Sequence, residues 1–188
     1  MIVAFSTSSP LASVALISSS GSLLASAQRE ARHAAGGACL EMLTSLLAEA
    51  GRSLDEVETF AADLGPGSFT GVKVGVTLAK TLAFAMGAQA AGASSFDLID
   101  PESRSAVPCR KGEYLVRDPG AEPRRVAGTP AGALGYGPEF ENPRWPLAER
   151  FGALAGRLVR MAPEALVPEY VLEPNISTPK RPYGSPSG

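Results

Sequence analysis

The sequence predicts an α/β protein with two lobes of unequal size, and three observations support this. Three short apolar runs, Ile2 to Ser6, Ala12 to Ser18 and Leu23 to Gln28, are separated only by turn residues, which is typical of an antiparallel meander. Segments with helical spacing then alternate with further short apolar runs. After residue 101 the apolar runs become short and Pro and Gly become frequent. We therefore expect an N-terminal lobe over residues 1–101 and a smaller C-terminal lobe with an extended tail over residues 102–188.

The most distinctive stretch is a glycine-rich turn that follows the apolar run 59–64. Its seven residues are Gly65, Pro66, Gly67, Ser68, Phe69, Thr70 and Gly71. Glycine adopts positive φ without steric cost and proline lacks an N–H, so the run predicts a tight turn whose backbone amides are open to a ligand or a partner. Its spacing matches neither the P-loop nor the dinucleotide-binding fingerprint.

The segment after this turn carries two competing periodicities. Its valines alternate as in a strand, whereas small residues recur every four positions as on one face of a helix: Gly71, Gly75, Ala79 and Ala83. The run to Met86 is too long for an ordinary strand and its second half is rich in helix formers, so we predict a helix with Ser68 as its N-cap. The small residues allow close approach of another element, either in the core of the chain itself or at a partner interface.

A second helix is predicted over residues 34–50, where leucines recur at helical spacing and Gly51 follows as a C-cap. The remaining expected elements are a capped turn after Ser53, a strand at 89–91, a capped helix at 94–99, a hairpin over 105–116, a loop-like region at 119–146 with one or two short strands, a helix over 147–161 and an extended tail after Tyr170.

Composition narrows the functional classes. A net charge of −2 leaves no footprint of an autonomous nucleic-acid binder, so any contact with RNA would be indirect. No apolar run approaches the roughly 20 residues needed to span a membrane, and the N-terminus lacks the features of a signal peptide, so we expect a cytoplasmic protein. Cys39 and Cys109 lie far apart in the sequence, which is more typical of two buried thiols than of a disulfide or a pair of metal ligands. His33 is the only histidine.

The run from Gly65 to Gly75 resembles the hallmark of the TsaB (YeaZ) family, GPGSFTG followed by valine, a basic residue, a hydrophobic residue and glycine. Supporting matches are the opening strand with its Ser-Thr turn, the hairpin residues 110–114, the closing run 168–170, and Pro179 with Lys180. The resemblance covers most of the chain, and the hallmark run is its specific part.

This resemblance implies an actin-like, Hsp70-like ATPase (ASKHA) fold of two lobes, here with a shortened second lobe. Family members are non-catalytic paralogues of TsaD, the protein that transfers a threonylcarbamoyl group to an adenosine of certain tRNAs. They pair with TsaD through the two N-lobe helices and support assembly with the ATPase TsaE. The resemblance therefore implies a heterodimer, with a homodimer possible for the isolated chain. It implies no cofactor for the chain itself, although a nucleotide at the complex interface stays open.

Three departures from catalytic relatives of this fold predict that the chain is not an enzyme. Ser6 stands where those relatives end the first strand with an acid, His33 is followed by Gly37 rather than by a second histidine, and Pro108 precedes Cys109 in the second lobe. Metal binding and phosphoryl transfer need several charged ligands, so we expect no catalytic residue and no metal site. The alternative is a free-standing phosphotransferase or peptidase-like enzyme of the same fold.

The expected partner surface lies on the two N-lobe helices. We predict that it is formed or supported by Leu40, Leu43, Leu47, Gly71, Gly75, Ala79 and Ala83. On this hypothesis Gly75→Leu abolishes pairing and leaves the fold mostly intact, whereas unfolding of that variant would mark the small residues as core.

Overall fold

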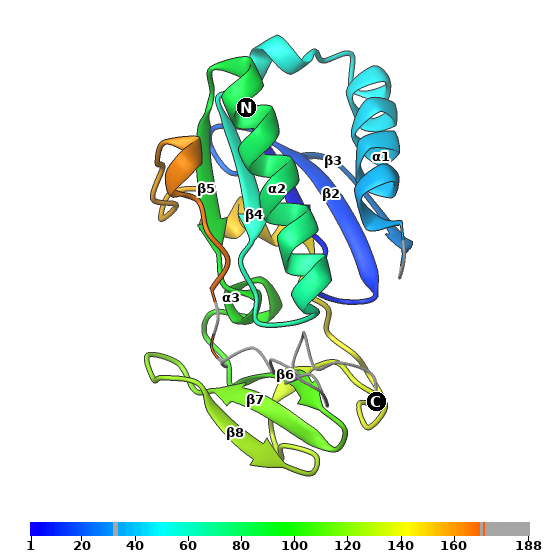
Figure 1. Ribbon diagram of the computed structural model, residues 1–188, viewed down its shortest axis with the longest axis vertical. Coiled ribbons are helices and arrows are strands. Elements are labelled where there is room, and N and C mark those ends of the chain that lie inside the picture. Colours follow the sequence, from blue (N-terminus) through cyan, green and yellow to red (C-terminus); the bar gives the residue numbers. More distant parts are fainter. Residues whose placement is uncertain (32–33, 170, 172–188) are drawn as a thin grey trace, which may run out of the picture.

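A computed structural model describes residues 1–31, 34–169 and 171 of the chain. Its larger sheet has five strands in the order β3-β2-β1-β4-β5 (Figure 1). They are β1 (Ile2–Ser6), β2 (Leu11–Ile17), β3 (Leu23–Glu30), β4 (Thr59–Asp63) and β5 (Gln89–Ala93). The first three form the predicted antiparallel meander, and β4 and β5 run parallel to β1. Every residue of β1 and β4 is buried, so both faces of the sheet centre are covered.

Two long helices, α1 (Ala35–Glu49) and α2 (Phe69–Met86), cover one face of this sheet (Figure 1). The predicted helical reading of the segment after the glycine-rich turn is confirmed. Its N-cap is Ser68, whose hydroxyl accepts a hydrogen bond from the Gly71 amide at 3.2 Å. It ends at Gly87, which adopts the left-handed conformation with a φ of 63°. The core beneath the helices contains Phe5 and Phe60, both fully buried.

The opposite face of the sheet is covered by a later segment. It contains η2 (Ala148–Arg150) and α4 (Phe151–Leu154), and Phe151 is fully buried in a cluster with Ile2, Ile17 and other sheet residues. This corrects two predictions, because residues 147–161 form only short helices and pack on the N-terminal lobe rather than the second one. Gly152 lies so close to the Gly21 backbone that an added Cβ would come within 2.7 Å of its carbonyl oxygen, so the segment packs tightly against the turn between β2 and β3.

The smaller sheet has the order β8-β7-β6-β9 and lies below the larger one in Figure 1. Its strands are β6 (Ser105–Arg110), β7 (Glu113–Arg117), β8 (Arg124–Ala127) and β9 (Leu134–Gly135), and α3 (Ser95–Ile99) leads into it. The hairpin and the two short strands expected in this region are present. Phe96 of α3 packs with Val107 and Tyr136, and Tyr136 stacks on Trp145 at 4.7 Å between ring centroids. One core therefore joins α3 to the second sheet.

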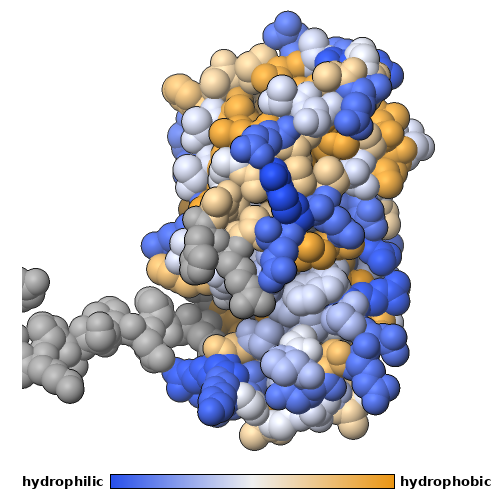
Figure 2. Space-filling model, turned by 90° about the vertical axis from the view of Figure 1, so that its right-hand side faces the viewer, coloured by the Kyte–Doolittle hydropathy of each residue, from blue (hydrophilic) through white to orange (hydrophobic). Residues whose placement is uncertain are grey.

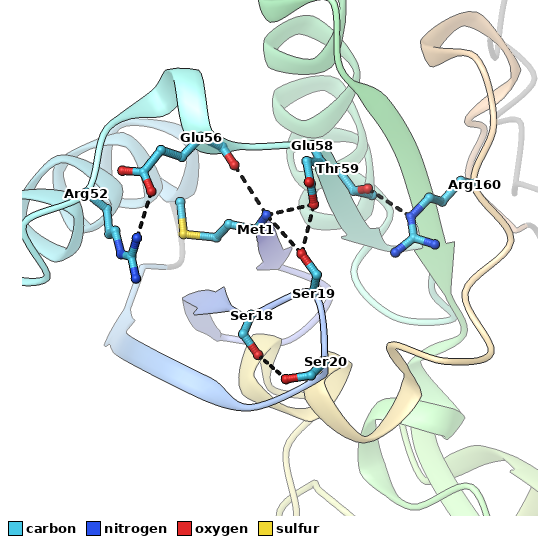
Figure 3. Close-up of polar contacts among 9 residues, drawn as sticks. All are labelled: Met1, Ser18, Ser19, Ser20, Arg52, Glu56, Glu58, Thr59 and Arg160. Carbon is cyan, nitrogen blue, oxygen red and sulfur yellow. Dashed lines mark hydrogen bonds and ion pairs between the residues drawn. The ribbon is translucent and has the colours of Figure 1, made fainter.

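Polar contacts fasten the outer end of β1 to the segment that precedes β4 (Figure 3). The Met1 ammonium lies 2.9 Å from the Glu58 carboxylate, which also accepts a hydrogen bond from Ser19 at 2.9 Å. This segment contains η1 (Leu54–Glu56), which has the predicted capped turn after Ser53. Beyond α4 the chain returns past β5 through a bridge between Ala90 and Met161 to η3 (Pro163–Ala165). Residue 170 and the tail 172–188, predicted to be extended, lie outside the described residues.

Candidate functional site

The glycine-rich turn clamps the turn between β1 and β2. The Ser68 amide donates to the Ser8 carbonyl oxygen at 2.7 Å. A Cβ added at Gly67 would lie 2.3 Å from that same oxygen, which explains why a glycine is needed there. The Gly65–Pro66 peptide bond is cis and Gly65 has a φ of 94°. The hallmark residues thus bring the start of α2 into direct backbone contact with the Ser6–Ser9 turn.

Several amides that the sequence left open to a ligand are used inside the chain. The Gly65 amide donates to the Asp63 carboxyl at 2.9 Å, and the Ser68 amide is taken by Ser8. The amides of Gly71 and Val72 donate to the side chain and carbonyl of Ser68. A phosphate cradle requires several amides that point at one ligand, so the turn is organised for packing.

The stripe of small residues on α2 faces the sheet of its own chain. A Cβ at Gly71 would lie 1.9 Å from the Thr7 carbonyl oxygen, and one at Gly75 would lie 2.6 Å from the Thr7 hydroxyl. Ala79 and Ala83 have no exposed surface. Of the two alternatives that the sequence left open, the stripe therefore lies in the core of its own chain, because β1 and its turn already occupy that space, and it can support a partner surface only from beneath. A leucine at Gly75 would disturb the core.

The predicted leucines of α1 divide between the core and the surface. Leu43 and Leu47 are buried beneath α1, whereas the Leu40 side chain is 44% exposed. Of the seven residues predicted for the interface, six therefore lie on the sides of the helices that pack on the sheet. Only Leu40 has an exposed side chain.

An exposed surface of uncharged side chains, bordered on α2 by Lys73 and Lys80, nevertheless runs along the two helices, and we call it the outer helix face. Gly36 of α1 faces Val74 of α2, with 3.6 Å between a Cβ built at Gly36 and the valine methyl. The outer helix face consists of residues on the sides turned away from the sheet: Leu40, Thr44, Thr70, Val74, Thr77, Thr81, Phe84 and Ala85. Phe84 is 72% exposed. Figure 2 shows the side of the molecule on which α1 lies, where hydrophobic patches over the larger lobe are interspersed with hydrophilic residues.

The two lysines of α2 have contacts near this face. The Lys73 ammonium lies 4.0 Å from the centre of the Phe69 ring, and Lys80 donates to the carbonyl of Glu164 at 2.9 Å. By length and composition α2 is the one described helix that could cross a membrane, and 33% of it is buried in the structure. A core helix of a soluble protein meets the same criterion. The exposed apolar residues of α2 are Phe69, Phe84 and Ala85, whereas Leu78, Leu82 and Met86 pack against the core.

A buried polar cluster lies where β1, β4 and α3 meet. Asp63, at the end of β4, is 1% exposed. The Ser6 and Ser8 hydroxyl oxygens lie 2.7 and 2.5 Å from its Oδ2, and the Ser95 hydroxyl oxygen lies 2.5 Å from its Oδ1. The Gly65 amide completes the shell. Burial raises the pKa of Asp63, although these hydrogen bonds act in the opposite direction.

Asp63 is a site residue that was not predicted from the sequence. Ser6 ends β1, which suggested that this end of the sheet had no acid, but β4 runs parallel beside β1 and pairs Phe5 with Ala62. Ser6 and Asp63 therefore leave the two strands at the same edge. The missed signal was an acid that directly follows an apolar strand and precedes a glycine-rich turn. Since its oxygens are enclosed by three hydroxyl groups and one amide, and no group of three metal-ligating side chains occurs in the described part of the chain, the cluster does not resemble a metal site.

The two cysteines, Cys39 and Cys109, are not joined to each other. Burial raises the pKa of Cys39 to about 12 and also raises the pKa of the half-buried Cys109, and both are free thiols. His33 lies outside the described residues. Pro108 occupies the inside of β6 and pairs with Tyr114.

A cavity of about 540 Å³ lies between the lobes and carries a negative balance of charge. Its lining includes Asp97, Glu122, Glu169 and Arg117. Arg117 donates to Asp97 at 2.5 Å and lies 5.0 Å from the centre of the Phe96 ring, so its charge is paired within the chain. Burial, followed by the charge of Asp97, raises the pKa of Glu169. Such a lining repels the phosphates of a nucleotide.

Comparisons with known proteins agree with this architecture. Residues 29–100 match the family model described as TsaD, tRNA N6-adenosine threonylcarbamoyltransferase. A stretch of 45 residues is 49% identical to the tRNA threonylcarbamoyladenosine biosynthesis protein TsaB of Haemophilus influenzae (strain KW20 Rd). This match covers 24% of the chain and 19% of that protein.

Two solved structures share the fold over most of the chain. YeaZ from Pseudomonas aeruginosa aligns with a TM-score of 0.69 at 22% identity, over 90% of this chain and 98% of that one. A protein described as uncharacterized, with similarity to peptidase YeaZ from Pseudomonas aeruginosa, aligns with a TM-score of 0.73 at 22% identity, over 91% and 99%. The chain is thus an α/β protein of the two-lobed ASKHA class. The family-model match, the TsaB relative and the YeaZ structures all agree with the TsaB/YeaZ family, so the predicted resemblance is confirmed.

Proposed function

We propose that this chain is a non-catalytic subunit of the machinery that makes N6-threonylcarbamoyladenosine in tRNA. In this proposal it pairs with a TsaD paralogue through the outer helix face and supports assembly with TsaE. The observation that carries the proposal is this uncharged, exposed face on α1 and α2, since both helices lie within the stretch that matches the TsaD family model. The short match to a TsaB protein supports the same pathway.

The composition of the outer helix face suits association with another helical surface. Leu40 and Phe84 provide large exposed apolar side chains, and four of the other residues of this face are threonines. Uncharged side chains cost less to remove from water than charged ones, and central apolar anchors contribute most of the energy of an interface. A paralogue with the same fold presents two equivalent helices, so a paired four-helix contact follows from the shared architecture.

The polar groups support a non-catalytic role. The carboxyl of Asp63 is enclosed, Arg117 is held by Asp97, and the cavity between the lobes has a negative balance of charge. Phosphoryl transfer needs cationic groups or a metal beside the phosphates. We therefore assign no cofactor and no catalytic residue to the chain itself. Contact with tRNA then runs through the partner, and the site of action is the cytoplasm.

The test is size-exclusion chromatography with light scattering of the chain alone and mixed with TsaD from the same organism. We expect a mixed dimer with the wild type. Thr81→Arg and Leu40→Arg should weaken it at least tenfold, because each places an unpaired charge on the outer helix face. Thr129→Arg is the matched control, since Thr129 is exposed on the smaller lobe, and it should pair normally.

Each outcome bears on the proposal. Thr81→Arg should keep the unfolding free energy of the wild type, which separates lost pairing from lost folding. Failure of the wild type to bind at micromolar concentration, with and without ATP, would contradict the proposal. Normal pairing by both arginine variants would place the interface elsewhere. A complex that needs ATP would point to a nucleotide at the interface, and adding TsaE to the mixture tests the larger assembly.

A further inference from the structure

The hydroxyl group of Ser6 has two acceptors and a single proton. Its Oγ lies 2.7 Å from Oδ2 of Asp63 and 2.6 Å from the carbonyl oxygen of Pro146. Both distances are those of an O–H···O hydrogen bond. A carbonyl oxygen and an ionised carboxylate can only accept, so with Asp63 charged one of these two contacts would have no hydrogen between its oxygens.

A proton on Oδ2 of Asp63 resolves this conflict. The carboxylic acid then donates to Ser6, and Ser6 donates to Pro146. On the other oxygen, Oδ1 accepts from the Gly65 amide at 2.9 Å and from the Ser95 hydroxyl at 2.5 Å. The Ser8 hydroxyl lies 2.5 Å from Oδ2 and 3.1 Å from the Ser95 oxygen, so it also has a partner.

The surroundings favour the neutral form as well. Asp63 is 1% exposed, and the shell around it consists of hydroxyl groups and one amide. The titratable groups that interact with it are Tyr136 from the smaller lobe and Glu169 from the C-terminal segment, and neither is a cation. Among the described residues, no arginine or lysine lowers its pKa. A buried carboxylate without a cationic partner is costly, and such groups bind a proton instead.

We propose that Asp63 is an uncharged carboxylic acid at neutral pH. In this form Asp63 donates to Ser6 and Ser6 donates to Pro146, and these hydrogen bonds hold together the two segments that connect the lobes. Ser95 begins α3, which leads from the larger sheet to the smaller one. Pro146 precedes η2, where the chain returns to the larger sheet. Both connections therefore meet at one carboxyl group. When Asp63 loses its proton, Ser6 can donate to only one of its two partners. We expect Ser6 to keep its hydrogen bond to the carboxylate and to lose the one to Pro146.

The experiment is urea unfolding of the wild type and Asp63→Asn at intervals from pH 4 to pH 8. The amide nitrogen of asparagine can replace the carboxylic O–H as donor to Ser6 without carrying a charge. A raised native pKa stabilises the fold fully below the unfolded pKa of about 3.8, and this contribution is lost as the pH rises. The ratio of the wild-type unfolding constant to that of the variant should therefore rise about tenfold per pH unit from pH 4 through pH 7.

The controls and the opposing results are defined by the same series. Asp55→Asn makes the same chemical change on the exposed η1 and is the matched control for the substitution itself. For Asp63→Asn, a ratio that is flat, falls with pH or levels off below pH 7 would overturn the proposal. If the variant does not fold, carbon-13 NMR titration of the wild-type aspartate carboxyls decides the question, because the Asp63 signal should show no ionisation up to pH 7.

The fastening role has its own readout. Ser6→Ala removes the link between Asp63 and Pro146, and Ser45→Ala is the exposed control on α1. Hydrogen exchange of the peptide covering residues 144–150 at pH 7 should be at least tenfold faster in Ser6→Ala and unchanged in Ser45→Ala. Equal exchange in both variants would overturn this part of the proposal.

Discussion

Gly71→Ala tests the packing of the glycine-rich turn with the smallest possible change. The added methyl carbon would lie 1.9 Å from the Thr7 carbonyl oxygen and must retreat to at least 3.0 Å, a shift of about 1.1 Å. Neither side moves freely. Gly71 is in the first turn of α2, and the turn that contains Thr7 is held by the hydrogen bond from the Ser68 amide to Ser8 at 2.7 Å.

The size of the effect follows from three contributions. Overpacking of this kind costs about 1–3 kcal/mol. The same shift breaks the hydrogen bond that the Thr7 hydroxyl donates to the Gly71 carbonyl at 2.7 Å, a further loss of about 1 kcal/mol. Alanine regains up to about 1 kcal/mol through helix propensity. We therefore expect Gly71→Ala to lower the free energy of unfolding by about 1–3 kcal/mol.

Gly37→Ala is the matched control, because a Cβ built at this exposed position of α1 meets nothing within 4 Å. It should raise the free energy of unfolding by about 0.5 kcal/mol through helix propensity alone. Urea unfolding followed by circular dichroism measures both variants. If Gly71→Ala were as stable as Gly37→Ala, the close contact between α2 and the turn after β1 would be wrong.

Three further predictions concern other parts of the structure. Phe151→Ala should cost about 3–5 kcal/mol in urea unfolding because Phe151 is fully buried against the larger sheet, whereas Phe84→Ala, at a side chain 72% exposed, should change stability by less than about 0.5 kcal/mol. Ser68→Ala should cost about 1 kcal/mol through loss of the N-cap, and an unchanged midpoint would contradict the capping role. Cys109 should react with a thiol reagent at pH 8 well before Cys39, since a pKa of about 12 leaves Cys39 only about one part in ten thousand thiolate; equal rates would mean that Cys39 is accessible.

Local signals were sufficient to predict most elements of the larger lobe. The strands of the meander are separated by short turns, and α2 lies between a serine N-cap and a glycine that requires the left-handed conformation. Such signals lie within a few residues of the element that they define, so they are readable without knowledge of the tertiary structure.

The direction in which a helix faces could not be predicted in the same way. A stripe of small residues permits close approach, but it does not say whether the neighbour is Thr7 of the same chain or a partner helix. The helical spacing of residues 147–161 indicated buried positions, and Phe151 and Leu154 are indeed buried. The spacing did not show that these residues pack on the larger sheet as short helices. Asp63 was missed because its partners, Ser6 and Ser95, are far from it in sequence.

The two sides of α2 differ in burial, and this difference makes the proposed function testable. Gly71 and Gly75 on the inner side are needed for contact with Thr7, so substitutions there report on folding. Thr77 and Thr81 on the outer side are exposed, so substitutions there leave the core intact and report on association. A glycine variant that loses a partner does not identify the interface, because the same change disturbs the fold. Only the outer positions distinguish a lost interface from a lost structure.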